Sequence, residues 1–187
     1  AASTLDSGVA ATSVMNVGEV TSGGNALTLD SGSDVSAVIT VSSYVGGGDI
    51  TVRDSGATTF SGVVSAGTVT IQDTTGVVVF GGSTTIGTAL VTQNNGYGVS
   101  FTGAVNSVAG ETNFLNTGTV TLGDGSGDSI TFAGGLGTTG NATNPGLVQV
   151  AGSVITTDAQ MDLGAVTLTA ASTLDSGVAA TSVMNVG

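Results

Sequence analysis

The side chains that could carry out chemistry in this 187-residue chain are almost all oxygen-bearing ones. Thirteen acidic residues stand against a single basic one, Arg53, and histidine, cysteine and tryptophan are absent. The chain therefore lacks the imidazole, thiolate and lysine amine that serve as common nucleophiles and as zinc or haem ligands. Carboxylate and hydroxyl chemistry remains, which points to calcium binding or to glycoside hydrolysis.

One glycine-rich stretch, residues 123–130, places alternate oxygen ligands at Asp124, Ser126 and Asp128. The first half of an EF-hand calcium loop has this spacing, but the glycine expected at its sixth position is Ser129 and the glutamate expected at its twelfth is Gly135. The stretch is a candidate calcium site, and the alternative is an ordinary solvated loop. We expect no cofactor other than calcium.

Two pairs of carboxylates have the spacing of possible hydrolytic sites, Asp158 with Asp162 and Asp30 with Asp34. Each pair lies in turn-like sequence. Enzymes that cleave acidic polysaccharides also need cations to hold the sugar, and Arg53 alone does not supply them. We therefore expect no enzymatic activity and no catalytic residues.

The net charge of −12 repels phosphate backbones, so we expect no nucleic-acid partner. The mean hydropathy of +0.45 is positive, yet no window approaches the roughly 18 to 20 consecutive apolar residues of a membrane-spanning helix. The apolar residues are valine, alanine and isoleucine scattered among threonine, serine and glycine. This composition is typical of β-structure.

The sequence of residues 1–18 is repeated, without a single change, at residues 170–187. We call these two stretches the first and second copies of the repeated segment. We expect residues 1–169 to be one full tandem repeat unit and residues 170–187 to be the start of the next, within a longer array.

A shorter rhythm lies inside this unit, in which a β-branched run leads to an Asp or Asn turn and then to a glycine. The glycines that mark it recur at nearly even intervals, at positions 8, 32, 56, 76, 96 and 118. One structural unit per roughly 20 to 25 residues is typical of solenoids.

Three phenylalanines, Phe60, Phe80 and Phe101, keep the spacing of these glycines and are expected to stack. Phe132 follows later than this spacing requires. The longer interval indicates an inserted loop or an extra short turn near residues 113–125.

These patterns predict an all-β chain that forms a β-solenoid of about 7–8 coils over residues 1–169. Alternating runs such as residues 68–71, 119–122 and 166–169 have the period of half-buried strands. Each coil would bond to the coils on either side, because one coil cannot bury its apolar face alone. The alternative is a pair of immunoglobulin-like sandwiches, which usually show turn signals every roughly 8 to 12 residues and a large buried core residue such as tryptophan.

Residues 116–136 and 150–178 resemble the repeats of filamentous-haemagglutinin-type exoproteins and autotransporter passengers. The resemblance covers most of the chain and is mainly compositional. It implies a right-handed parallel β-helix from a long bacterial surface or secreted protein that serves adhesion. The family has no catalytic residues to transfer to this chain.

From the repeat and this resemblance we expect a structural unit of an extracellular fibre, sheath or adhesive stalk. Its main partner would be itself, through neighbouring repeats or chains, and its other partners glycans or other cells. The alternative is a ligand-binding module for glycan, calcium or ice on a monomeric surface adhesin.

Two features bear on that alternative. The Thr-x-Thr pairs begin at residues 68, 119 and 167, so they are too far apart in sequence to supply one ice-binding threonine pair per coil. Tyr44 and Tyr97 are either exposed adhesive contacts or corner packing.

Overall fold

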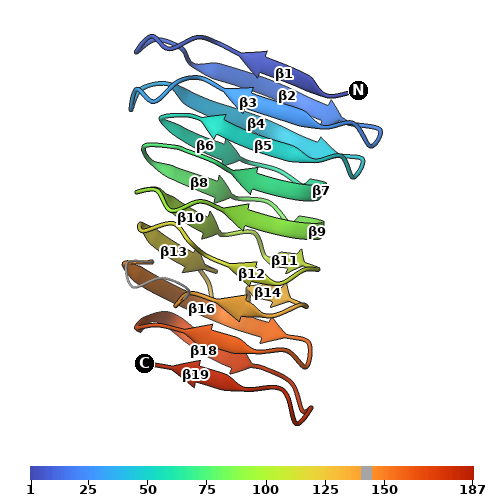
Figure 1. The fold of residues 1–187 in the computed structure, drawn as a ribbon, viewed down its shortest axis with the longest axis vertical. Coiled ribbons are helices and arrows are strands. Elements are labelled where there is room, and N and C mark those ends of the chain that lie inside the picture. Colours follow the sequence, from blue (N-terminus) through green and yellow to red (C-terminus); the bar gives the residue numbers. More distant parts are fainter. Residues whose placement is uncertain (140–144) are drawn as a thin grey trace.

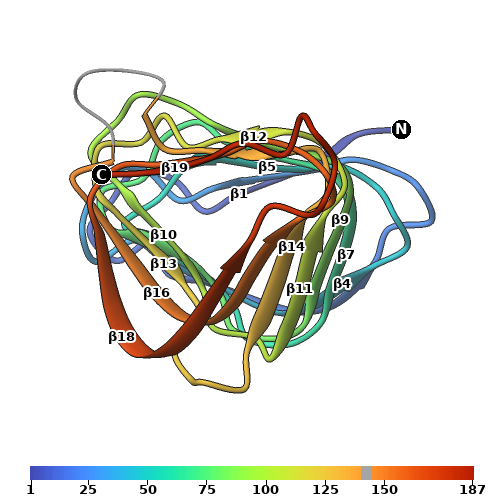
Figure 2. The same cartoon turned by 90° about the horizontal axis from the view of Figure 1, so that it is seen from below.

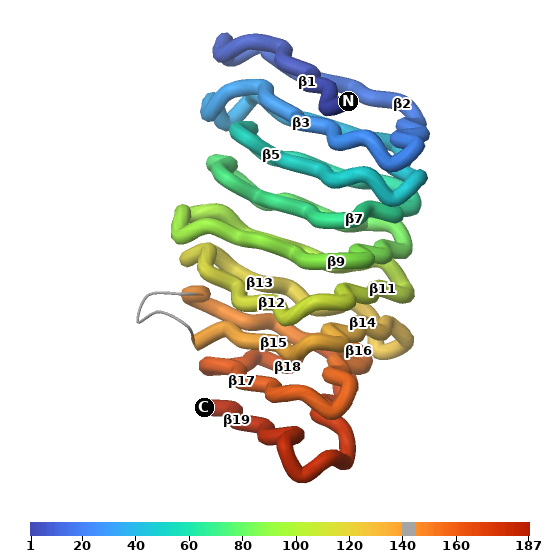
Figure 3. Tube along the Cα trace, turned by 45° about the vertical axis from the view of Figure 1, so that its right-hand side comes forward, coloured from blue at the N-terminus to red at the C-terminus, as the bar shows by residue number. Residues whose placement is uncertain are grey.

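The chain folds into a stack of β-strand coils that advance along one axis (Figures 1 and 3). The structure is a computed structural model that describes residues 1–139 and 145–187. Within these ranges there is no helix. All strand pairings are parallel, which excludes the sandwich alternative because sandwiches are built from antiparallel strands. The predicted β-solenoid is confirmed.

Each coil has three faces, named here in the order in which the chain reaches them. The first face consists of β1 (Ser3–Asp6), β3 (Leu27–Asp30), β5 (Ile50–Asp54), the second halves of β7 (Val64–Ile71) and β9 (Thr84–Thr92), β12 (Thr112–Asn113), β15 (Leu136–Gly137), β17 (Met161–Leu163) and β19 (Met184–Val186). These strands lie on one side of the cross-section (Figure 2).

The second and third faces share several strands that bend around the corner between them. The second face consists of the first halves of β2 (Met15–Thr21) and β4 (Val38–Val45), then β6 (Ala57–Phe60), β8 (Val77–Phe80), β10 (Gly98–Phe101), β13 (Thr119–Leu122) and the first halves of β16 (Leu147–Thr156) and β18 (Val166–Asp175). The third face consists of the second halves of β2, β4, β16 and β18, the first halves of β7 and β9, β11 (Val105–Val108) and β14 (Ser129–Phe132).

The stack makes about eight turns. Seen from the C-terminal end, the chain runs counter-clockwise while it advances toward the viewer, so the coil is right-handed (Figure 2). That is the handedness that the family resemblance implies. The coils are unequal in length, since their first-face strand segments begin at residues 3, 27, 50, 68, 89, 112, 136, 161 and 184.

The interior is filled by columns of apolar side chains, one residue from each coil. Phe60, Phe80 and Phe101 are paired in register on the second face. Their rings stack at centroid distances of 5.3 and 4.7 Å. The predicted phenylalanine stack is confirmed for these three residues.

Phe132 does not continue the phenylalanine column. Leu122 takes the next place, opposite Phe101, whereas Phe132 lies on the third face and meets the Phe101 ring edge-on. The longer interval before Phe132 therefore comes from a change of face together with the loop at residues 123–128. The expected extra short turn is wrong, and the expected inserted loop is correct.

Glycines follow these phenylalanines because successive coils approach closely at the corner between the second and third faces. A Cβ at Gly82 would collide with the carbonyl group of Gly62, and one at Gly103 would collide with that of Gly82. A glycine column is therefore needed wherever this corner is tight.

We expect Gly82→Ala to lower the free energy of unfolding by about 1–3 kcal/mol, because the added methyl group must push two coils apart. Gly96→Ala is the matched control, since a Cβ at Gly96 meets nothing within 4 Å and its φ is not positive. Urea unfolding followed by circular dichroism measures both variants. Equal effects of the two substitutions would contradict the close-packed corner.

Candidate functional site

The two copies of the repeated segment lie at the two ends of the stack, and they adopt the same local structure. In each copy the aspartate accepts a hydrogen bond from the glycine N–H two positions later, at 2.8 Å for Gly8 to Asp6 and for Gly177 to Asp175. Both glycines have φ of 91°. The sequence of the segment therefore determines this turn, whichever end of the stack the segment occupies.

The two copies differ in which of their strand edges is paired with a neighbouring coil. The first copy pairs only with the coil that follows it, and the second copy only with the coil that precedes it. Met15 packs beneath Ile39 and is 9% exposed, whereas its counterpart Met184 has only Met161 behind it and is 38% exposed. The second copy thus presents half-covered apolar side chains and an open strand edge.

Large exposed apolar residues are concentrated in these two coils. Of the thirteen found in residues 1–139 and 145–187, eight lie within residues 1–18 or in the last coil, namely Leu5, Val9, Val14, Leu168, Val178, Val183, Met184 and Val186. In a stacked fold such residues are the ones that a further coil would cover. The two ends are therefore the strongest candidate for a functional surface.

Asp158 fixes the second copy onto the coil before it. Its Oδ1 accepts hydrogen bonds from the backbone N–H groups of Val178 and Ala179 at 2.7 and 3.0 Å. These bonds hold the pKa of Asp158 below its ordinary value. Asp158 also has a positive φ of 53°, a conformation that aspartate tolerates better than most residues do.

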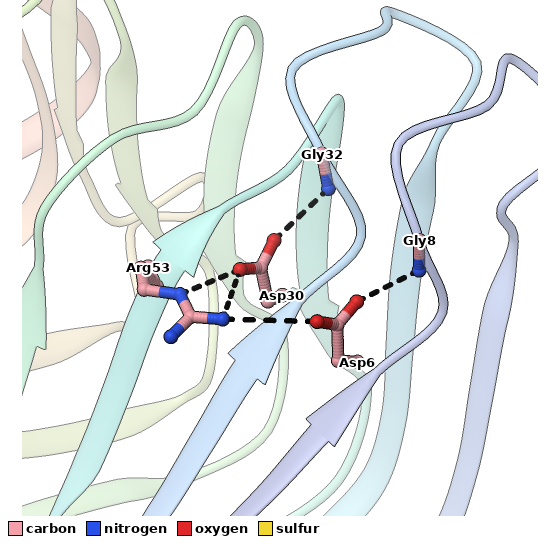
Figure 4. A network of polar contacts seen from close by, with 5 residues as sticks. All are labelled: Asp6, Gly8, Asp30, Gly32 and Arg53. Carbon is pink, nitrogen blue, oxygen red and sulfur yellow. Dashed lines mark hydrogen bonds and ion pairs between the residues drawn. The ribbon is translucent and has the colours of Figure 1, made fainter.

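A second polar network begins at the first copy, on the first face (Figure 4). Arg53 is the extra residue of a β-bulge, since Leu29 pairs with Val52 and Asp30 with Asp54. Its Nε donates to Asp30 at 2.5 Å, and its guanidinium lies 3.9 Å from Asp6. The only basic residue of the sequence therefore ties the first copy to the two coils that follow it.

These contacts account for one of the carboxylate pairs considered from sequence. Asp30 is bound by Arg53 and by the N–H of Gly32, and Asp34 accepts from the N–H of Ser36. In the other pair, Asp158 holds the turn of the second copy while Asp162 lines a groove described below. Of these four carboxylates, all except Asp162 are thus engaged in a turn or a coil-to-coil contact.

The candidate calcium residues lie on the loop between β13 and β14. Asp128 accepts from the N–H groups of Asp124 and Gly125, both at 2.8 Å, which lowers the pKa of Asp128. A hydrogen bond with Asp128 raises the pKa of Asp124. Ser126 is exposed at the tip. Across residues 1–139 and 145–187, no group of three or more acidic side chains is placed to hold a metal ion, and calcium at this loop stays a prediction.

A shallow polar groove of about 310 Å³ crosses the first face between β12, β15 and β17. Its polar side chains include Glu111, Asn113, Gln160 and Asp162. Sequence reasoning missed this groove because its residues come from coils that are distant in the sequence. Only the register of three consecutive coils brings them together.

The threonines are arranged differently from what the spacing of the Thr-x-Thr pairs indicates. Single threonines do form a column on the first face, consisting of Thr4, Thr28, Thr51 and Thr70, which ends at Val91. The column is one side chain wide and is flanked by the Arg53 network. Of the two alternatives stated for Tyr44 and Tyr97, burial excludes exposed adhesive contacts and favours corner packing, since both side chains are fully buried.

Comparison of the chain with protein-family models, curated proteins and solved structures finds no match. In the part of the chain that the structure describes, there is also no helix able to cross a membrane.

The burial of the Tyr97 hydroxyl predicts how the stability of the fold changes at alkaline pH. Its hydroxyl donates to the carbonyl of Ile71 and accepts from the N–H of Gln93, and burial raises its pKa from 10 to about 12. Between these two values only the unfolded chain loses the proton, so the free energy of unfolding falls by about 2–3 kcal/mol as the pH rises from 10 to 12.

Urea unfolding across this pH range measures the loss of stability, and absorbance at the tyrosinate band measures ionisation. Tyr97→Phe should be less stable at pH 8 but should lose less stability between pH 10 and 12. Tyr44→Phe is the comparison variant that keeps Tyr97. Ionisation of both tyrosines near pH 10 in the folded protein would contradict this account.

Proposed function

We propose that this chain is a repeat unit of an extracellular fibre, sheath or adhesive stalk, in which identical units continue one solenoid. The observation that carries the proposal is the repeated segment, which forms a strand, a turn and a second strand on two adjacent faces both at the start and at the end of the stack. Residues 1–18 are covered by the coil that follows them, so the identical residues 170–187 are suited to the same cover from a following unit.

The role of such a unit is mechanical. The backbone hydrogen bonds between coils run along the axis, and continued stacking removes the open strand edges that otherwise pair nonspecifically. Residues 1–169 carry twelve acids and one arginine, since Asp175 is the one acid in the second copy. This charge favours solubility and separation of neighbouring fibres at low salt.

The resemblance to filamentous-haemagglutinin-type proteins supports the extracellular or cell-surface location and an adhesive role. The right-handed parallel coil is compatible with that origin. Partners in this proposal are neighbouring units, together with glycans or other cells at the outer surface. The role requires no catalytic residue.

The proposal can be tested with a longer chain, in which residues 19–187 are appended once more after Gly187. We expect a single rod that is about 37 Å longer than the original, because the added residues contribute between seven and eight coils at about 4.8 Å each. Electron microscopy gives the length, and urea unfolding should show one cooperative transition with a larger m-value.

The matched control has the same composition but a shuffled order at residues 170–187. It should give two shorter bodies joined by a linker. If the intact chain also gives two separate bodies, the fibre proposal is wrong.

The groove on the first face favours a second candidate function, binding of neutral glycans. Glu111 and Asp162 repel acidic sugars, while their oxygens and the amides of Asn113 and Gln160 suit sugar hydroxyls. Glycan binding by the groove would be supported if the chain binds neutral oligosaccharides, if Gln160→Ala abolishes this binding, and if the exposed control Gln93→Ala keeps it. No binding to the unmodified chain at millimolar glycan would rule it out.

A further inference from the structure

The two identical segments lie on different faces of the solenoid. Ser3–Asp6 forms β1 on the first face, whereas the same sequence at residues 172–175 is the second half of β18 on the third face. Likewise, residues 15–17 lie on the second face and residues 184–186 on the first. Figure 2 shows β1 and β19 on one side and β18 around the opposite corner.

This shift follows from the number of coils in one unit. Seven full turns separate β1 from β17, the eighth strand position on the first face. The chain then passes the second face at Val166 and reaches the third face at Ser172. One unit, residues 1–169, therefore advances the solenoid by seven turns and two of three faces.

We infer that successive units in an array are rotated by one face, so that three units complete a repeat of 23 turns. This inference rests on the proposed function for the existence of the array, but the rotation itself is a property of the present chain. At about 4.8 Å per turn, the complete repeat is about 110 Å long.

The local contacts allow the segment to change face. Its turn is closed by its own hydrogen bonds, from Ser13 N to Ala10 O in the first copy and from Ser182 N to Ala179 O in the second, both at 2.9 Å. Its strands pair in parallel with a neighbouring coil on either face. The side-chain contacts differ between the copies, with Arg53 near Asp6 in the first and Asp158 bonded to Val178 and Ala179 in the second. The covering coil of the next unit therefore brings the counterparts of Asp30 and Arg53 against Asp175, on the third face.

The rotation decides how an array presents its surface. The groove lined by Glu111 and Asp162 lies on the first face of one unit. It would lie on each of the other two faces in the two units that follow. An array thus displays the same surface on all three sides, and a partner that binds one unit meets an equivalent site every ~37 Å along the axis, one face further round.

Disulfide cross-linking in this 187-residue chain tests the face assignment, because the chain has no cysteine of its own. Ser153 lies opposite Thr173, and Asp162 lies opposite Asn185. Directly opposed positions on neighbouring strands have Cα atoms within the range that a disulfide spans. We expect S153C/T173C and D162C/N185C to form intramolecular disulfides under mild oxidation, and D162C/T173C to keep both thiols free.

The control T59C/V79C joins an opposed pair inside the unit and reports whether such a disulfide forms in this fold. Monomer mass and thiol titration give the readout, and circular dichroism checks that each variant is folded. The inference is overturned if D162C/T173C closes, or if the control closes while S153C/T173C does not.

These outcomes are separable from the fibre proposal. Cross-links as expected in a chain whose lengthened form gives two separate bodies would leave the rotation standing and remove the array. A continuous rod from the lengthened chain, together with a disulfide in D162C/T173C, would leave the array standing and overturn the rotation.

Discussion

The structure depends on parallel hydrogen bonding between each coil and the next. No coil encloses an interior by itself, so every apolar side chain that points inward is buried only when neighbouring coils cover it. Met161 and Met184 show this dependence directly, because they are opposed on the same face and Met161, with a coil on each side, is fully buried, whereas Met184, with a coil on one side only, is 38% exposed. Stability in such a fold is a sum over neighbouring coils.

The remaining features keep the coils aligned. The phenylalanine column fills the second face, glycines permit close approach at the next corner, and buried tyrosine hydroxyls bond to backbone groups where the chain turns. Charged residues also help to align the coils, since Arg53 and Asp158 each form hydrogen bonds between consecutive coils. A single exposed ion pair contributes little to the free energy of unfolding. We therefore infer that the charged residues fix the register between coils and that the apolar columns supply the stability.

Much of the fold could be predicted from local sequence. The spacing of Asp-Gly turns indicated the coil length, and the even spacing of Phe60, Phe80 and Phe101 predicted their stack. Phe132 could not be placed, because a longer loop before it changes which face it reaches. Since the coils differ in length, such errors accumulate along the chain.

The candidate sites were less predictable for the same reason. The groove joins Glu111 to Asp162 across two coil intervals, and the threonine column takes one residue from each of four coils. Neither set is adjacent in sequence, and both depend on register. The shift of the repeated segment from the first face to the third is the clearest case, because identical residues carry no sign of which face they occupy.

The most direct test of a continuous solenoid is a near-atomic image, by electron cryomicroscopy, of an array of six or more units. The account predicts an unbroken stack of coils about 4.8 Å apart that passes through every copy of the repeated segment, with units related by an advance of about 37 Å and a rotation of one face. Separate bodies joined by linkers at those segments would contradict it.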